Sequence, residues 1–172
     1  MKKLRVAVDT SVISEVKEDS PNKYETIEFF GKCLQYKNKI EVFVPPTVLE
    51  ELKKAPPEVL NYFKWLEKEG CLKVIQSLLI INKRWKTREK LLKHIINEKD
   101  RRKKSLKTSD LKIIIDSSLL RCRFLIAYNI EDFRKRGKKE FIEKILKKHK
   151  LIVPKILTPK EFLEFLEKLD FK

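Results

Sequence analysis

The chain has 172 residues, of which 42% are hydrophobic, and this length suits one domain with a core of its own. It has no apolar run long enough to span a bilayer and no signal-peptide stretch at its N-terminus, which predicts a cytoplasmic protein without a membrane partner. The 41 basic residues against 25 acidic ones give a net charge of +16, an excess that favours a polyanionic partner. Heat-adapted proteins share this Lys- and Glu-rich composition, so charge alone does not establish nucleic-acid binding.

Strands and helices alternate along the first half of the chain. A short β-branched run at residues 4–8 predicts a buried strand, and helical spacing of apolar residues follows it. The expected strands lie at 4–8, 41–44 and 72–75, and the expected helices at 22–37, 47–54 and 58–68.

The second half repeats this alternation. We expect helices at 82–104, 111–122 and 138–148, strands at 124–128 and 151–156, and a last helix opened by residues 158–161. Strands that alternate with helices predict a parallel sheet with helices on both faces. The expected fold is α/β, with three α/β/α layers, a mostly parallel sheet of four or five strands, and one domain over residues 1–172.

The cysteines and histidines are scattered. Cys33, Cys71 and Cys122 form no CxxC pair, and His94 and His149 each stand alone in the sequence. This spacing predicts buried reduced thiols rather than disulfides or a zinc site, and histidines at the surface or half-buried on helices.

Oxygen-bearing side chains occur at four positions along the chain, three of them after predicted strands and one at the start of the helix that precedes the fourth strand. These residues are Asp9, Glu50, Glu51, Asp110, Asn129 and Asp132. Because ligands bind at the carboxyl ends of parallel strands, we expect these side chains at one edge of the sheet. Grouped carboxylates repel one another unless a cation neutralises them, and ligands that are all oxygen favour Mg²⁺ or Mn²⁺.

The same segments resemble, in order, the motifs of PIN-domain proteins. VAVDTS resembles the opening motif, with Asp9 as its metal-binding residue, and VPPTVLEEL the second, with Glu51 before Leu. SDLKIII resembles the third motif, with Asp110 opening an apolar helix, and FLIAYNIEDF the fourth, with Asn129 and Asp132. IVPKILTPKEFLEF is similar to the last strand and closing helix, so the resemblance covers nearly the whole chain.

Membership of this family implies an endoribonuclease that hydrolyses RNA phosphodiester bonds with Mg²⁺ or Mn²⁺. The implied metal ligands are Asp9, Glu51, Asp110 and Asn129, and the implied catalytic set adds Asp132. The sequence departs from the family at two points: Ala127 stands where Thr or Ser is frequent, and Asn129 is a neutral ligand. A second metal position should therefore bind more weakly.

Several of these positions have a second reading. Glu50 competes with Glu51, but their side chains point about 100° apart on a helix, and the family motif favours Glu51. Asp110 is either a ligand or only a helix cap, a task that Ser109 is also able to perform. Asp132 is a ligand through water or a cap of the next turn. Asp116 is expected to be an ordinary, satisfied helix residue because its face differs from that of Asp110 by about 120°.

A basic run directly precedes Asp110. Its cationic members, which we take as candidates for RNA binding, are Lys99, Arg101, Arg102, Lys103, Lys104 and Lys107. Basic residues beside a metal site are placed to grip a phosphodiester backbone, although a solvated face has the same composition.

The sequence leaves other functions and partners open. One alternative is a catalytically weak PIN scaffold that binds RNA or a protein, and another is a VapC-type toxin, which would have a cognate antitoxin. A homodimer is also left open.

Overall fold

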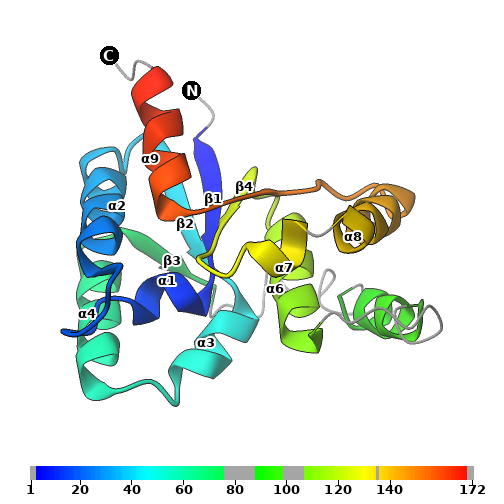
Figure 1. Cartoon of the computed structure of the whole chain (residues 1–172), viewed down its shortest axis with the longest axis horizontal. Coiled ribbons are helices and arrows are strands. Elements are labelled where there is room, and N and C mark those ends of the chain that lie inside the picture. Colours follow the sequence, from blue (N-terminus) through cyan, green and yellow to red (C-terminus); the bar gives the residue numbers. More distant parts are fainter. Residues whose placement is uncertain (1–2, 76–87, 99–106, 135, 170–172) are drawn as a thin grey trace.

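The computed structural model describes residues 3–75, 88–98, 107–134 and 136–169. Five parallel strands form one sheet in the order β3-β2-β1-β4-β5. Figure 1 shows the sheet between α2, α4 and α9 on one side and α6 and α8 on the other. The predicted three-layer α/β/α fold with a parallel sheet is confirmed.

The sheet is centred on β1. The strands are β1 (Leu4–Val8), β2 (Ile40–Val44), β3 (Leu72–Val74), β4 (Phe124–Ile126) and β5 (Lys155–Leu157). Val8 pairs with Ile126, and Ile126 pairs with Leu157, so these strands end at one edge. Val6, Ala7 and Val8 are each 0% exposed, as expected for a parallel strand covered on both faces.

Helices connect the strands. They are α1 (Thr10–Ser14), α2 (Lys23–Gln35), α3 (Pro46–Leu52), α4 (Pro57–Lys68), α6 (Thr108–Leu119), α7 (Glu131–Arg134), α8 (Arg136–Lys148) and α9 (Pro159–Lys168). Residues 88–98 are helical as well. Proline at the first position opens α3, α4 and α9, where its fixed φ suits a helix and its missing N–H costs nothing.

The predicted elements differ from the observed ones in several places. The short helices α1 and α7 were not predicted, because four or five residues are too few to display a helical period. Helix α6 begins at Thr108 with Lys107 as its N-cap, so Ser109 lies inside the first turn and is not the cap. The last strand was predicted at 151–156 and is observed at Lys155–Leu157. The expected helix at 82–104 is described only at 88–98.

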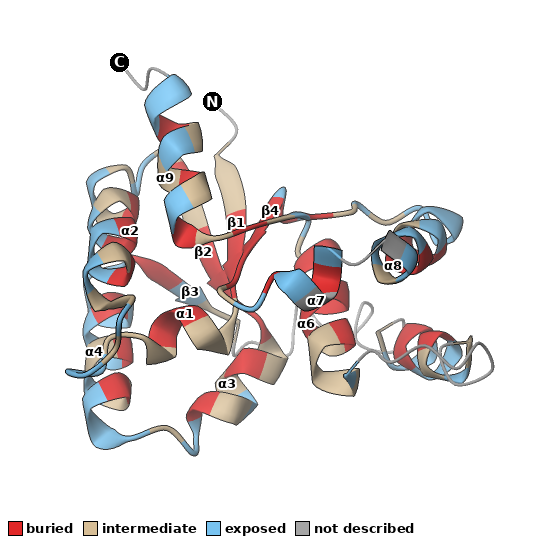
Figure 2. Ribbon diagram, viewed as in Figure 1, coloured by how far each residue is buried: buried red, intermediate tan, exposed pale blue. Residues whose placement is uncertain are grey.

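The buried hydrophobic residues form one cluster, and Figure 2 shows buried residues both on the strands and on the helices around them. Aromatic rings pack edge to face within this cluster, as Phe29 does on Phe30 and Phe162.

The three cysteines are free and buried, which confirms the prediction of reduced thiols. Burial raises the pKa of Cys71 and that of Cys122 to about 12. None of the described helices is long and apolar enough to cross a membrane.

Candidate functional site

Asp9 is held at the carboxyl end of the central strand. Its backbone N–H donates to the Ile126 carbonyl over 2.9 Å, which extends the pairing of β1 with β4. Its side chain caps α1 by accepting a hydrogen bond from the Ser11 amide at 3.1 Å. A carboxylate at this position also interacts favourably with the helix dipole. Sequence and local geometry therefore fix Asp9 where the strand ends and the helix begins.

Thr10 links this turn to α3. The Thr10 hydroxyl donates a hydrogen bond to the half-buried Glu51 carboxylate. Because Thr10 directly follows Asp9, this bond places Glu51 near the end of β1. Glu50, the alternative to Glu51, is 69% exposed in its side chain and pairs with Lys53 at 2.8 Å. The two neighbouring glutamates therefore differ: Glu51 faces α1, and Glu50 faces solvent.

Ser11 links Asp9 to the segment after β4. Its hydroxyl donates to Asp9 Oδ2 over 2.5 Å and accepts from the Tyr128 amide at 3.2 Å. The next residue, Asn129, is exposed. Ala127 is fully buried and offers no hydroxyl of its own.

Tyr128 continues the connection to α2. Its hydroxyl is 2.9 Å from the Thr26 hydroxyl, and it donates to the Asn22 carbonyl at 3.4 Å. Burial raises the pKa of Tyr128 far above its usual range, so the phenol stays protonated. The segment that leads to Asn129 is thereby fixed on two sides, by Ser11 and by α2.

Asp110 lies in the first turn of α6 and is half-buried. Helix α6 packs against α3, the helix that carries Glu51. Thr47 is one turn before Glu51 on α3, so the two side chains lie on the same helix face. Thr47 bonds to Asp116 of α6, whereas Glu51 bonds to Thr10 of α1, so this face of α3 contacts both helices.

Asp116 forms a buried ion pair with Arg88, a partner that the sequence did not predict. The side chain is 2% exposed, and Oδ2 accepts from Thr47 Oγ1 and from Arg88 Nη2, each at 3.1 Å. Arg88 also donates to Thr47 at 3.2 Å. Asp116 is the satisfied helix residue that was expected, and it joins α3, α6 and helix 88–98. An aspartate in an apolar helix signals that a partner exists but does not identify Arg88.

The donors at this edge suit a hard divalent cation, because carboxylates and hydroxyls supply only oxygen. Contacts gather Asp9, Glu51 and the segment before Asn129. Within residues 3–75, 88–98, 107–134 and 136–169, however, no group of three or more His, Cys, Asp or Glu side chains is arranged to hold a metal ion. The donor chemistry therefore fits a cation, whereas the contacts assemble two carboxylates rather than the predicted larger set.

The remaining predicted residues are placed only in part. Lys107 is exposed at the start of α6. The other basic candidates, Lys99, Arg101, Arg102, Lys103 and Lys104, lie outside the described residues. Asp132 lies in α7, but its side chain is likewise outside them.

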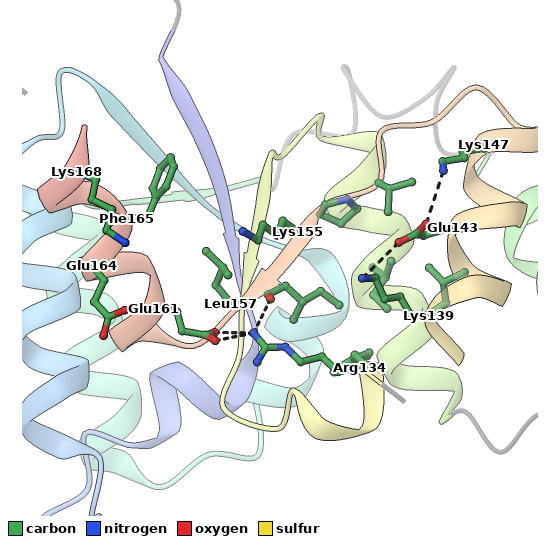
Figure 3. A pocket seen from close by; sticks show the side chains of 16 residues that line it. Arg134, Lys139, Glu143, Lys147, Lys155, Leu157, Glu161, Glu164, Phe165 and Lys168 are labelled. Carbon is green, nitrogen blue, oxygen red and sulfur yellow. Dashed lines mark hydrogen bonds and ion pairs between the residues drawn. The ribbon is translucent and has the colours of Figure 1, made fainter. Parts of the chain in front are cut away.

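A pocket of about 930 Å³ lies beside α7, between α8, β5 and α9 (Figure 3). Arg134 donates to the Glu161 carboxylate at 2.7 and 2.8 Å and to the Ile156 carbonyl at 3.3 Å. Burial raises the pKa of Glu161, but hydrogen bonds from Arg134 and Thr158 outweigh it and lower the pKa overall. On the wall formed by α8, Lys147 Nζ lies 3.7 Å from Glu143 Oε2. The pocket walls thus carry paired charges of both signs.

Comparison with known proteins leaves the family open. No protein-family model matches the chain, and no curated protein matches it. The residues at the carboxyl edge of the sheet and the resemblance of the sequence motifs are therefore the basis for a functional proposal.

Proposed function

We propose that this protein is a PIN-like, metal-dependent endoribonuclease whose site is built on Asp9 and Glu51. The observation that supports the proposal is the set of hydrogen bonds around α1. Thr10 binds Glu51, while Ser11 binds both Asp9 and the backbone just before Asn129. These bonds connect the Asp9 and Glu51 side chains with the backbone next to Asn129, at the carboxyl ends of β1 and β4, the kind of edge where ligands of parallel sheets bind.

In this proposal Asp9 and Glu51 hold Mg²⁺ or Mn²⁺, with Asp110 and Asn129 as further predicted ligands and Asp132 completing the site. A bound divalent cation supplies an activated water and stabilises the charge that develops on the phosphate. Thr10 and Ser11 orient the two carboxylates through their hydroxyls. Attack by water rather than by the RNA 2′-hydroxyl would leave 5′-phosphate and 3′-hydroxyl ends.

Asp9→Asn tests the proposal. The change keeps the shape of the side chain and its capping oxygen but removes the charge that attracts a cation. We expect wild-type protein to cleave RNA with Mn²⁺ but not with EDTA, and the variant to lose activity by at least about a hundredfold, since the ligand contributes to the chemical step itself.

Circular dichroism and thermal melting serve as controls that the Asp9→Asn fold is intact. Activity within a factor of about two of wild type would contradict the assignment of this site, because such a factor is under 1 kcal/mol of transition-state stabilisation.

A further inference from the structure

Helix 88–98 and α8 come together at one end of the molecule, although they are far apart in the sequence (Figure 1). The rings of His94 and His149 meet edge to face, with centroids 5.4 Å apart. The two histidines, each alone in the sequence, are therefore neighbours in the fold. We call helix 88–98 together with residues 136–150 the two-helix end.

The two-helix end is strongly basic. Helix 88–98 and α8 contain nine Lys or Arg residues and four Asp or Glu residues. Lys90 and Lys93 on the first helix are exposed, as are Lys144 and Lys148 on the second. Burial, then the proximity of His94 and of Lys148, lowers the pKa of His149. In the sequence His149 lies between Lys148 and Lys150, so its chain neighbours are cationic.

Contacts distinguish two pairs of lysines in α8. Lys139 and Lys147 flank Glu143, at 4.0 and 3.7 Å, and line the pocket (Figure 3). Lys144 and Lys148 are one turn apart, so they share a helix face, and neither has a carboxylate partner among the described residues. The positive charge of Lys144 and Lys148 is therefore not neutralised by an ion pair with any described residue.

The two-helix end is connected to the proposed site by the chain itself. Helix 88–98 precedes α6, whose first turn holds Asp110, and α7 leads directly into α8 and packs against it. A strand of RNA held at the two-helix end would therefore lie near the elements that carry Asp110, Asn129 and Asp132.

We propose that Lys90, Lys93, Lys144 and Lys148 form a phosphate-binding surface that holds RNA for the proposed nuclease. The inference rests on the proposed function, since it assigns a substrate-binding surface to the same site. Lysines spaced along exposed helix faces contact backbone phosphates without reading the sequence. A lipid surface is the weaker fit, because the apolar residues of α8 (Phe141, Ile142, Ile145 and Leu146) are all buried in the fold and leave no face for a bilayer.

A matched pair of double variants tests the surface. Lys144→Gln with Lys148→Gln removes two charges from α8, and Lys64→Gln with Lys68→Gln removes two from α4. Both pairs are exposed, one turn apart and placed with the second lysine in the last helical turn. Helix α4 lies at the other end of the long axis (Figure 1). Glutamine has a helix propensity close to that of lysine, so both variants should fold.

Binding of a short single-stranded RNA is measured in EDTA, where cleavage does not interfere, over a range of salt concentrations. The α8 variant should bind at least about tenfold more weakly at low salt and lose roughly 1.4 from the slope of log K against log salt, or 0.7 for each phosphate contact. The α4 variant should remain within about threefold of wild type, since it loses only long-range charge.

The outcomes separate this surface from the proposed nuclease. Equal losses in the two variants, no RNA binding by wild type, or preferential binding of anionic phosphatidylserine vesicles would each overturn the surface. Lysine-dependent RNA binding by a wild-type protein that fails to cleave RNA with Mn²⁺ would support the surface and remove the nuclease.

Discussion

The two ends of the long axis are built differently. At one end, α2 and α4 carry four basic and four acidic residues, and they pack through aromatic rings such as Phe30 against Tyr62. At the other, helix 88–98 and α8 carry nine basic and four acidic residues, and the buried pair Arg88–Asp116 fastens helix 88–98 to α6. The first end has balanced charge and packs through aromatic rings, whereas the second carries an excess of positive charge.

The largest stability loss is expected at the packed end. Phe29 is fully buried against Phe30 and Phe162. Phe29→Ala should lower the free energy of unfolding by about 3–5 kcal/mol, because it removes a large side chain and leaves a cavity. Urea denaturation measures the loss. A loss below about 1 kcal/mol would mean that this end does not carry the stability of the fold.

The charged end should respond to loss of its ion pair. Arg88→Met leaves Asp116 buried without its guanidinium, so we expect a loss of about 3 kcal/mol. Adding Asp116→Asn removes the stranded charge and should restore part of the stability, since an amide is still able to bond to Thr47. If the double variant is less stable than Arg88→Met alone, charge burial is not the cause of the loss.

The smallest expected effect is a pH dependence. Burial, His94 and Lys148 lower the pKa of His149. In the sequence this histidine stands two residues after Lys147 and directly before Lys150. In the window between the unfolded pKa of about 6.5 and the lower folded value, the unfolded chain binds more protons. Stability should therefore fall as pH drops through this window, and His149→Gln should flatten the fall. Melting temperatures measured from pH 7.5 to 5 that decline identically in both proteins would contradict this.

Local sequence determined much of the fold. The β-branched run before Asp9 predicted β1 with its observed bounds, and Thr158-Pro159 with Glu161 opened α9 through a capping box. Contacts between distant segments were not predictable. Nothing in the sequence near His94 indicates His149, because their approach depends on how two helices pack onto the sheet.

For the candidate site, the sequence predicted which edge of the sheet the residues occupy but not the contacts between them. Because ligands bind at strand ends, the sequence predicted Asp9 and Glu51 at one edge of the sheet. In the structure, Thr10, the neighbour of Asp9, is hydrogen-bonded to Glu51 there. The sequence did not indicate that the hydroxyls of Thr10 and Ser11 would hold the carboxylates, since such bonds depend on the side-chain geometry of the short helix α1. The functional roles of Asp9, Glu51, Asp110, Asn129 and Asp132 all remain predictions.

The stability of neighbouring glutamate variants with and without Mn²⁺ tests for a metal site at Asp9 and Glu51. Thermal melts of wild type, Glu51→Gln and Glu50→Gln are recorded with EDTA and with Mn²⁺. A ligand that binds only the folded state at a hundred times its Kd stabilises it by about 2.7 kcal/mol. We predict this order of shift for wild type and for Glu50→Gln, whose side chain faces solvent, and a distinctly smaller one for Glu51→Gln. Equal Mn²⁺ shifts in all three proteins, or none in any, would contradict a metal site at Asp9 and Glu51.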